Sequence, residues 1–280
     1  MYREEKRVVM PKVRLHRRVL FNYSLQAFCG MAMLFAASAG AQDPKAVAVS
    51  VGDASVRGDR LQPFKNQWHM SVTTADGKVL DDAGTWTDEM EAVTVEGRAC
   101  WKRTQVATYK ARNGEVRATS KTVNTFDRRT LAPVYREFEK RVAGNENTRT
   151  KISFSEKSLR IESTEQGNTE VKDLPASPAF DFYGGVYAML WVALPLKHGF
   201  TATFPSYTED EHPEQVRQVT YQVTGRESID AGPRRKVNAW IVESDTVIGS
   251  LKYWISEDAP YIIRMDFKQK NGALWVLKMV

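Results

Sequence analysis

Hydrophobic and polar residues alternate along most of the chain beyond residue 60. The run from Val219 to Thr224 alternates apolar with polar side chains, and so does the run from Ile263 to Lys268. Successive side chains of a β-strand point to opposite faces, so such runs indicate strands with one buried and one solvated face. This arrangement is typical of antiparallel sheets. We predict strands over 67–74, 79–90, 92–96, 99–109, 116–126, 134–142, 148–155, 159–164, 169–174, 201–207, 217–224, 236–243, 247–256, 261–268 and 273–280.

Short turn signals separate these predicted strands. Asp76-Gly77 and Asn113-Gly114 are examples, and such pairs accept the positive φ angles of tight hairpin turns. Many strands at close spacing favour a sandwich or a barrel, and these strands are long for a sandwich. We therefore expect one mainly β domain over 59–280, an antiparallel meander that forms an open or closed barrel.

One segment, Phe180–Leu196, lacks this alternation and is apolar almost throughout. It predicts a helix over 181–194 with Asp181 as its N-cap, because a carboxylate accepts the free N–H groups of a first helical turn. The helix is too short to span a bilayer, which takes about 20 apolar residues. Since it is apolar on all sides, we expect the barrel to wrap around it. It would join two halves, 60–174 and 200–280.

A weak internal repeat supports these halves. Val95-Glu96-Gly97-Arg98 resembles Val223-Thr224-Gly225-Arg226, and 38 residues after each Arg stands another, Arg136 and Arg264, in a strand that begins with Ala-Pro. The pattern predicts two related meanders. The alternative is a chance likeness between strands that share the same turn chemistry.

The N-terminal residues 1–41 have the pattern of a signal peptide. Basic residues precede an apolar stretch, and Ala39-Gly40-Ala41 fits the small-x-small cleavage rule. We expect cleavage before Gln42, export to the periplasm, and a flexible lead-in over 42–58. An uncleaved membrane anchor is the alternative. After cleavage no membrane-spanning segment is expected.

Cleavage changes the charge of the chain. Residues 1–41 hold seven of the 40 Lys and Arg and two of the 34 Asp and Glu, so 33 basic and 32 acidic residues remain, a net charge near +1. This balance gives no reason to expect nucleic acid as a partner. Only Cys100 remains after cleavage, so an intramolecular disulfide is excluded; its role, buried thiol or nucleophile, stays open.

Motifs of catalysis are missing from the sequence. It has no His-Glu-x-x-His pattern, no Gly-x-Ser-x-Gly elbow and no Gly-rich phosphate loop. The run Glu209–Glu214 is the most metal-like, but it has no glycine to shape an oxygen cage, so a solvated loop is favoured over a metal site. His198 is interpreted as a turn residue. We therefore predict no catalytic residue, no metal and no cofactor.

Large aromatic side chains suggest a ligand site instead. They either line an apolar cavity beside the helix or fill it completely. Arg264 would contact an anionic head group, although ion pairs of Arg136 and Arg264 with Glu137 and Asp266 are the favoured alternative. The candidate ligand-binding residues are Phe182, Tyr183, Tyr187, Trp191, Trp240, Trp254 and Arg264.

Three segments resemble an uncharacterised family of exported bacterial β-barrel proteins. They are Leu194–Gly199, Val223–Glu227 and Tyr253–Pro260, and the likeness extends over roughly 120–280. That family is in turn similar to the periplasmic lipoprotein carriers and receptors, LolA and LolB, which wrap a curved sheet around a helix. The resemblance implies this fold and the handling of a hydrophobic ligand, and it assigns no catalytic residue.

Three functions follow as hypotheses. The favoured one is a periplasmic, non-enzymatic protein that binds or carries a lipid, an acyl chain or another amphiphile. The second is a structural or assembly factor of the cell envelope that binds protein through a sheet edge. The third is an unrecognised hydrolase.

Overall fold

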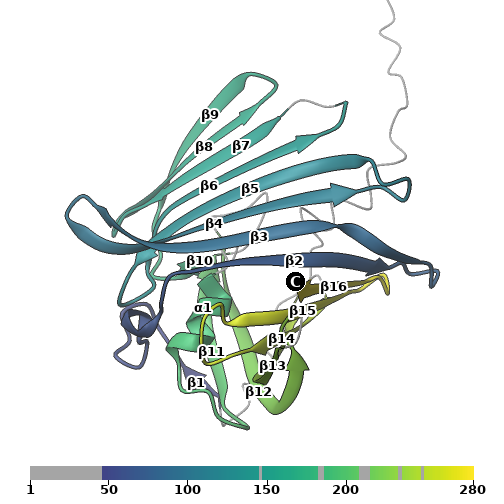
Figure 1. The fold of residues 1–280 in the computed structure, drawn as a ribbon. Helices are drawn as coiled ribbons and strands as arrows, with labels where there is room; N and C mark the ends of the chain where they lie inside the picture. Colours follow the sequence, from purple (N-terminus) through teal and green to yellow (C-terminus); the bar gives the residue numbers. More distant parts are fainter. Residues whose placement is uncertain (1–45, 145–146, 182–185, 208–214, 233–234, 247–248) are drawn as a thin grey trace, which may run out of the picture. The chain divides into compact units, whose positions relative to one another are not determined.

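The computed structural model describes residues 46–144, 147–181, 186–207, 215–232, 235–246 and 249–280. Within them the fold is mainly β, with one short α-helix, as the alternation predicts (Figure 1). The elements are β1 (Val47–Ala48), η2 (Gly58–Arg60), β2 (Phe64–Thr73), β3 (Val79–Val95), β4 (Arg98–Lys110), β5 (Val116–Asp127), β6 (Pro133–Val142), β7 (Thr148–Phe154), β8 (Ser158–Glu165), β9 (Asn168–Pro175), β10 (Phe180–Asp181), α1 (Val186–Ala193), β11 (Thr201–Tyr207), β12 (Val216–Asp230), β13 (Lys236–Thr246), β14 (Gly249–Ile255), β15 (Ile262–Gln269) and β16 (Leu274–Met279).

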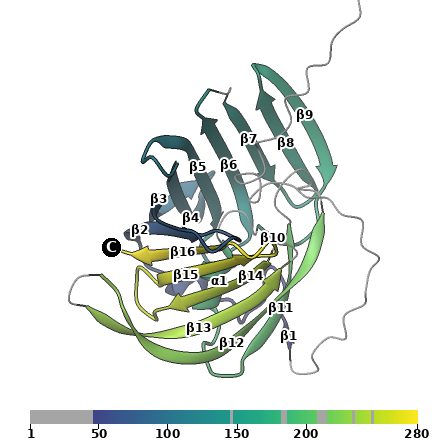
Figure 2. The same cartoon turned by 90° about the vertical axis from the view of Figure 1, so that its right-hand side faces the viewer.

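The strands form one sheet from two meanders. One runs from β2 to β9 and the other from β11 to β16, and each strand pairs antiparallel with the next. The two meet where β16 pairs with β2, with Trp275 opposite Val72 and Leu277 opposite Met70 (Figure 2). The first and last long strands of the described chain are therefore neighbours.

The two copies of the motif behind the predicted internal repeat adopt different structures. Glu96 and Gly97 have φ of 51° and 79° and form the tight turn between β3 and β4. The matching Thr224 and Gly225 lie inside β12, where the register shifts between Val223 and Gly225. The same residue types thus make a hairpin turn in one place and a β-bulge in the other, and the bulge lets β12 continue to Asp230.

The expected helix start at Asp181 is also wrong. Asp181 is the last residue of β10 and lies opposite Tyr207 of β11, while α1 spans Val186–Ala193. Its carboxylate accepts a hydrogen bond from Arg136 Nη1 at 2.7 Å, so an ion pair replaces the predicted cap. No helix in the described ranges is long and apolar enough to cross a membrane.

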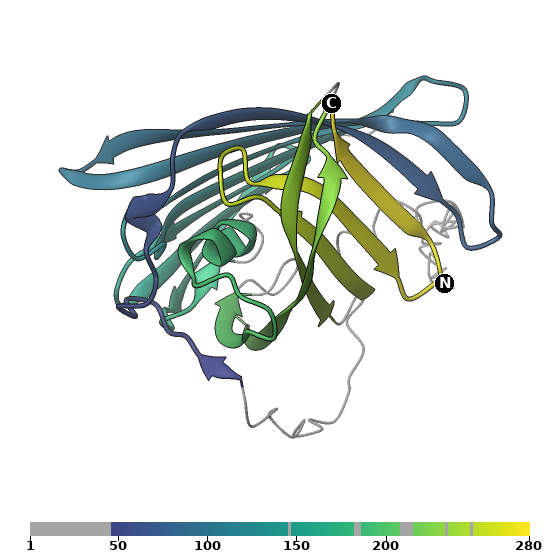
Figure 3. The same cartoon turned by 60° about the horizontal axis from the view of Figure 1, so that its bottom comes forward.

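Helix α1 is packed against aromatic side chains. Trp191 is fully buried, and its ring lies 5.4 Å from that of Tyr221, 6.3 Å from Phe200 and 6.4 Å from Phe204, centroid to centroid. Figure 3 shows the green helix next to the purple segment that contains η2. The interior beside Trp191 is therefore filled on the side of these three rings.

Residues 46–58, part of the expected lead-in, contribute to the core. Val47 and Ala48 form β1 and pair with β11, and Val49 and Val56 are buried. The backbone carbonyl of Gly58 accepts a hydrogen bond from Trp101 Nε1 at 3.0 Å. A Cβ at Gly58 would lie 2.6 Å from the carbonyl oxygen of Arg128, which explains why glycine stands there.

Among the described strands the hydrogen-bonded path does not close on itself. It ends at β9 on one side and at β1, β10 and β11 on the other. Side chains nevertheless join the two ends. A buried apolar cluster and the Arg136–Asp181 ion pair bring β6–β8 into contact with the segment around β10 and β11; the cluster consists of Ile152, Leu159, Ile161, Ala179 and Tyr207.

Candidate binding site on the inner face of the sheet

The candidate site lies on one face of strands β2–β6, which are adjacent in Figure 1. We call this the inner face; it carries the buried side chains of Trp68, Met70, Met90, Trp101 and Phe126. Residues directly opposite on neighbouring strands share a face. The register pairs Arg103 of β4 with Asn124 of β5, and Asn124 with Arg136 of β6. A polar row therefore crosses the inner face.

Both arginines of this row are buried in ion pairs. Arg103 Nε donates to Asp88 Oδ1 at 2.8 Å, and each of these residues is only 1% exposed. Arg136 is likewise paired with Asp181, and both are buried. Two positive charges thus face two negative charges, so the four groups add no net charge to the inner face.

Asn124, between the two arginines, has no such partner. Its side chain is 3% exposed, and both Oδ1 and Nδ2 are buried without a hydrogen-bond partner among the described residues. Buried amides in proteins are nearly always hydrogen-bonded, because an unpaired buried polar group costs about 1–3 kcal/mol. An unpaired amide at the centre of a polar row marks a position where a further hydrogen-bonding group is needed.

The next rows of the inner face mix polar and apolar side chains and become less buried, and the second of them ends with half-buried Lys140 opposite Ser120. Gln105 and Thr122 are buried, and Phe138, opposite Thr122, is half-buried. One row further, half-buried Trp86 lies opposite the small Ala107. Ser120 follows opposite Ala107, so small side chains stand beside a large aromatic one. This succession places aromatic surface, from Phe138 and Trp86, within two rows of the buried polar row.

Trp86 lies on the inner face and packs against Trp68. Its ring meets that of Trp68 edge to face, with centroids 6.1 Å apart, and its Nε1 is a second buried donor without a partner in the described part of the chain. An edge-to-face contact fixes the ring orientation. Trp86 therefore offers an apolar surface together with a free N–H group.

The predicted ligand residues do not come together. Trp240 lies opposite Ile255, whereas Trp254 lies opposite the neighbouring Ile241, so the two tryptophans point to opposite faces of the sheet. Trp191 is packed in the core as described above. Phe182 and Tyr183 lie outside the described residues, and Tyr187 lies in α1.

Trp254 is covered by cations. Arg264 Cζ lies 4.5 Å and Lys252 Nζ 5.1 Å from its ring centroid, and its Nε1 donates to Glu227. Arg264 also donates from Nε to Asp266 at 2.7 Å, so the expected partner is correct, although the pair lies within β15 and does not join two strands. These contacts satisfy Arg264 within the sheet, so it is not held ready for an anionic head group.

The expected pairing of Arg136 with Glu137 is wrong. The two are adjacent in β6, so their side chains point to opposite faces. Glu137 instead accepts a hydrogen bond from Arg149 Nε at 2.7 Å, while Arg136 reaches Asp181 across the inner face. Sequence neighbours in a strand are poor candidates for an ion pair for this reason.

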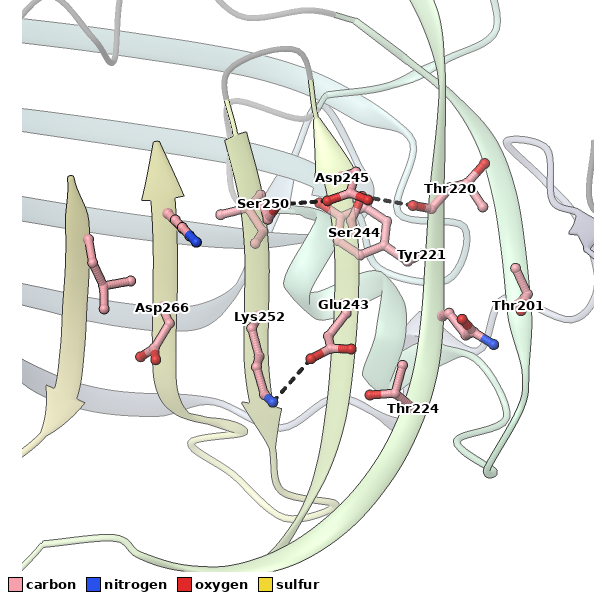
Figure 4. A pocket seen from close by; sticks show the side chains of 14 residues that line it. Thr201, Thr220, Tyr221, Thr224, Glu243, Ser244, Asp245, Ser250, Lys252 and Asp266 are labelled. Carbon is pink, nitrogen blue, oxygen red and sulfur yellow. Dashed lines mark hydrogen bonds and ion pairs between the residues drawn. The ribbon is translucent and has the colours of Figure 1, made fainter. Parts of the chain in front are cut away.

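An open polar hollow of about 670 Å³ lies on the other face of β11–β15. Figure 4 shows Glu243 and Lys252 turned toward one another, and the same view shows Ser250 beside Asp245. Lys252 Nζ lies 3.1 Å from Glu243 Oε1, and Ser250 Oγ donates to Asp245 at 2.7 Å. Since these groups largely satisfy each other, the hollow has the character of a solvated sheet face.

Cys100 and His198 are the reactive side chains singled out in the sequence that the structure describes. Burial raises the pKa of the Cys100 thiol, which works against a thiolate nucleophile. His198 is exposed. The described residues contain no group of three His, Cys, Asp or Glu side chains placed to hold a metal ion, and the acidic run Glu209–Glu214 lies entirely outside them.

Sequence reasoning missed the polar row. Arg103 stands two residues after Trp101, and Asn124 two residues before Phe126, so each shares a face with a large buried aromatic side chain. That spacing was a usable signal. It was obscured because the opposite face of β4 is also polar, so alternation alone did not reveal which face is buried.

A long antiparallel meander that packs one face over a helix defines a β-barrel-like protein, and the comparisons agree. The chain is similar to a solved structure described as a beta-barrel-like protein of domain of unknown function DUF1849 from Brucella abortus. The two are 13% identical, with a TM-score of 0.53 over 79% of this chain and 97% of the other. At this identity the likeness shows the fold alone.

The chain belongs to the family of proteins of unknown function DUF3108, whose model matches residues 47–277. The resemblance to an uncharacterised β-barrel family is thereby confirmed, and it reaches well before residue 120. A search of the curated proteins found no match. The likeness to lipoprotein carriers and receptors stays a prediction.

Proposed function

We propose that this chain is an exported, non-enzymatic binding protein that holds one amphiphilic small molecule against the inner face of β3–β6. The observation that carries the proposal is the succession of rows on that face. A buried polar row, centred on the unpaired Asn124, is followed by half-buried aromatic side chains, Phe138 one row away and Trp86 two rows away. An amphiphile has the same succession of a polar end and an apolar chain.

Small side chains beside Trp86 support this arrangement. Ala107 and Ser120 follow Trp86 across the sheet, and both have small side chains. Apolar sites in proteins are lined mainly by hydrophobic and aromatic groups with a few fixed polar ones. The leader expected over residues 1–41 would deliver the protein to the periplasm, where amphiphiles of the envelope are available.

Binding of protein through a sheet edge is the second candidate. Strand β9 ends the hydrogen-bonded path, and its residues 168–173 are all exposed. An exposed edge can accept another strand. However, Glu170, Lys172 and Asp173 lie on β9, and charged side chains are a common protection of edges against such pairing. The inner face is therefore the better supported site.

Co-purification tests the proposal. The full chain is expressed with its leader in bacteria and purified from the periplasm without detergent. Its mass is then measured by native mass spectrometry. We expect a population that carries one amphiphile, because aromatic side chains lie within two rows of the buried polar row on the inner face. Ser120→Trp should reduce that population several-fold by filling the space beside Trp86.

Lys121→Trp is the matched control. Lys121 is the next residue of β5, is exposed and points to the other face, so this variant should retain the ligand. Apo mass alone in the wild-type protein would count against the proposal. So would equal loss of ligand in both variants.

A further inference from the structure

We infer that the polar end of the ligand is an uncharged group with both a hydrogen-bond donor and an acceptor, a carboxamide or a hydroxyl, that pairs with the side chain of Asn124. This inference rests on the proposed function and specifies the chemistry of its site. It excludes carboxylates, phosphates and ammonium groups as the preferred polar end.

The first reason is the state of Asn124. Both its Oδ1 acceptor and its Nδ2 donors are buried and lack a partner among the described residues. One ligand group satisfies both atoms of a side-chain amide only if that group both donates and accepts. A carboxamide or a hydroxyl does so in one group, whereas a carboxylate only accepts and an ammonium group only donates.

The second reason is the charge balance around Asn124. Its cross-strand neighbours, Arg103 and Arg136, are already paired with Asp88 and Asp181. An anion would have to compete with these buried carboxylates, and a cation would have to approach two guanidinium groups. Each would leave a buried charge uncompensated. An uncharged ligand group disturbs neither pair.

A buried water molecule is the competing occupant. Such waters commonly bridge polar groups that the protein leaves unpaired. A water would satisfy the hydrogen bonds of Asn124, and the protein would then have no preference for uncharged ligands. Ligand selectivity therefore distinguishes the two occupants.

The test measures the affinity of the delipidated full chain for four amphiphiles with the same twelve-carbon chain. These are dodecanamide, 1-monolauroylglycerol, laurate and dodecylamine, compared at pH 7 by isothermal titration calorimetry. We expect the two uncharged ligands to bind about tenfold more tightly than the two charged ones. Asn124→Leu should abolish this preference, and Asn238→Leu, at an exposed site on β13, should preserve it.

The relative affinities of the four ligands separate the inference from the proposed function. Equal or tighter binding of laurate or dodecylamine would overturn the inference and leave the proposed function standing. A preference for uncharged ligands that survives Asn124→Leu would also overturn the inference, because Asn124 would then hold water alone. Absence of binding by all four ligands would overturn the proposed function itself. The wild-type comparison needs no variant, so it holds even if Asn124→Leu fails to fold.

Discussion

Replacing Arg103 with Leu is expected to lower the free energy of unfolding by about 3–5 kcal/mol, because Asp88 would then be buried without its counter-charge. The carboxylate and the guanidinium are both almost inaccessible to water and are joined by two hydrogen bonds. Urea unfolding followed by tryptophan fluorescence measures the change.

Two further variants control this experiment. The double variant Arg103→Leu/Asp88→Leu should recover most of the loss, since no uncompensated charge remains. Arg160→Leu removes an exposed ion pair with Asp173 and should cost less than about 1 kcal/mol. If Arg103→Leu unfolds at the wild-type urea concentration, Asp88 and Arg103 are not the buried pair described above.

Trp191→Ala is expected to cost about 3–5 kcal/mol, the range for removing a large buried aromatic side chain. Trp191 is fully buried, and its ring meets those of Phe200, Phe204 and Tyr221. The cavity left by alanine would lie between α1 and the strands β11 and β12. The shift of the thermal or urea midpoint measures the loss.

Trp191→Phe serves as the matched control. Phenylalanine keeps an aromatic ring at this position, and Trp191 Nε1 has no hydrogen-bond partner among the described residues that would be lost. We therefore expect a clearly smaller cost than for alanine. Equal effects of the two substitutions, or no effect of alanine, would contradict the packing of Trp191 of α1 in the apolar core.

Most strands were predictable because each has a repeating local signal. Tyr221 and Val223 are buried, whereas Gln222 between them is exposed, as the alternation in sequence indicates. Turns such as Asp76-Gly77 mark where a strand must reverse. The exceptions occurred where pairing with a neighbouring strand overrode a local signal. Strand β3 continues through Glu91 because it pairs with β4 as far as Val95.

Features that depend on distant partners were not predictable. Asp181 has the chemistry of an N-cap, but its partner Arg136 lies 45 residues earlier in the chain. Nothing local to Asp181 reports that contact. Similarly, the pairing of β16 with β2 joins Leu277 to Met70 and follows from how the sheet curls rather than from either segment alone.

The candidate site proposed above differs from the one expected from the sequence. The aromatic side chains of the proposed site are Trp86 and Phe138, whereas the expected Trp240 and Trp254 lie on opposite faces of another part of the sheet. Residue type indicates that an aromatic side chain seeks an apolar surface. It does not indicate which of several sheet faces stays partly open, since that depends on the side chains from neighbouring strands.

Photo-crosslinking tests the central claim, that the inner face holds an amphiphile, most directly. The full chain is irradiated with a monoacylglycerol that carries a diazirine midway along its acyl chain, and the modified residues are mapped by mass spectrometry. The account predicts modification on the inner face of β3–β6, at or beside Trp86, Ser120 and Phe138, that excess unlabelled ligand suppresses. Modification confined to the polar hollow around Glu243 and Lys252, or spread over exposed strands without competition, would contradict it.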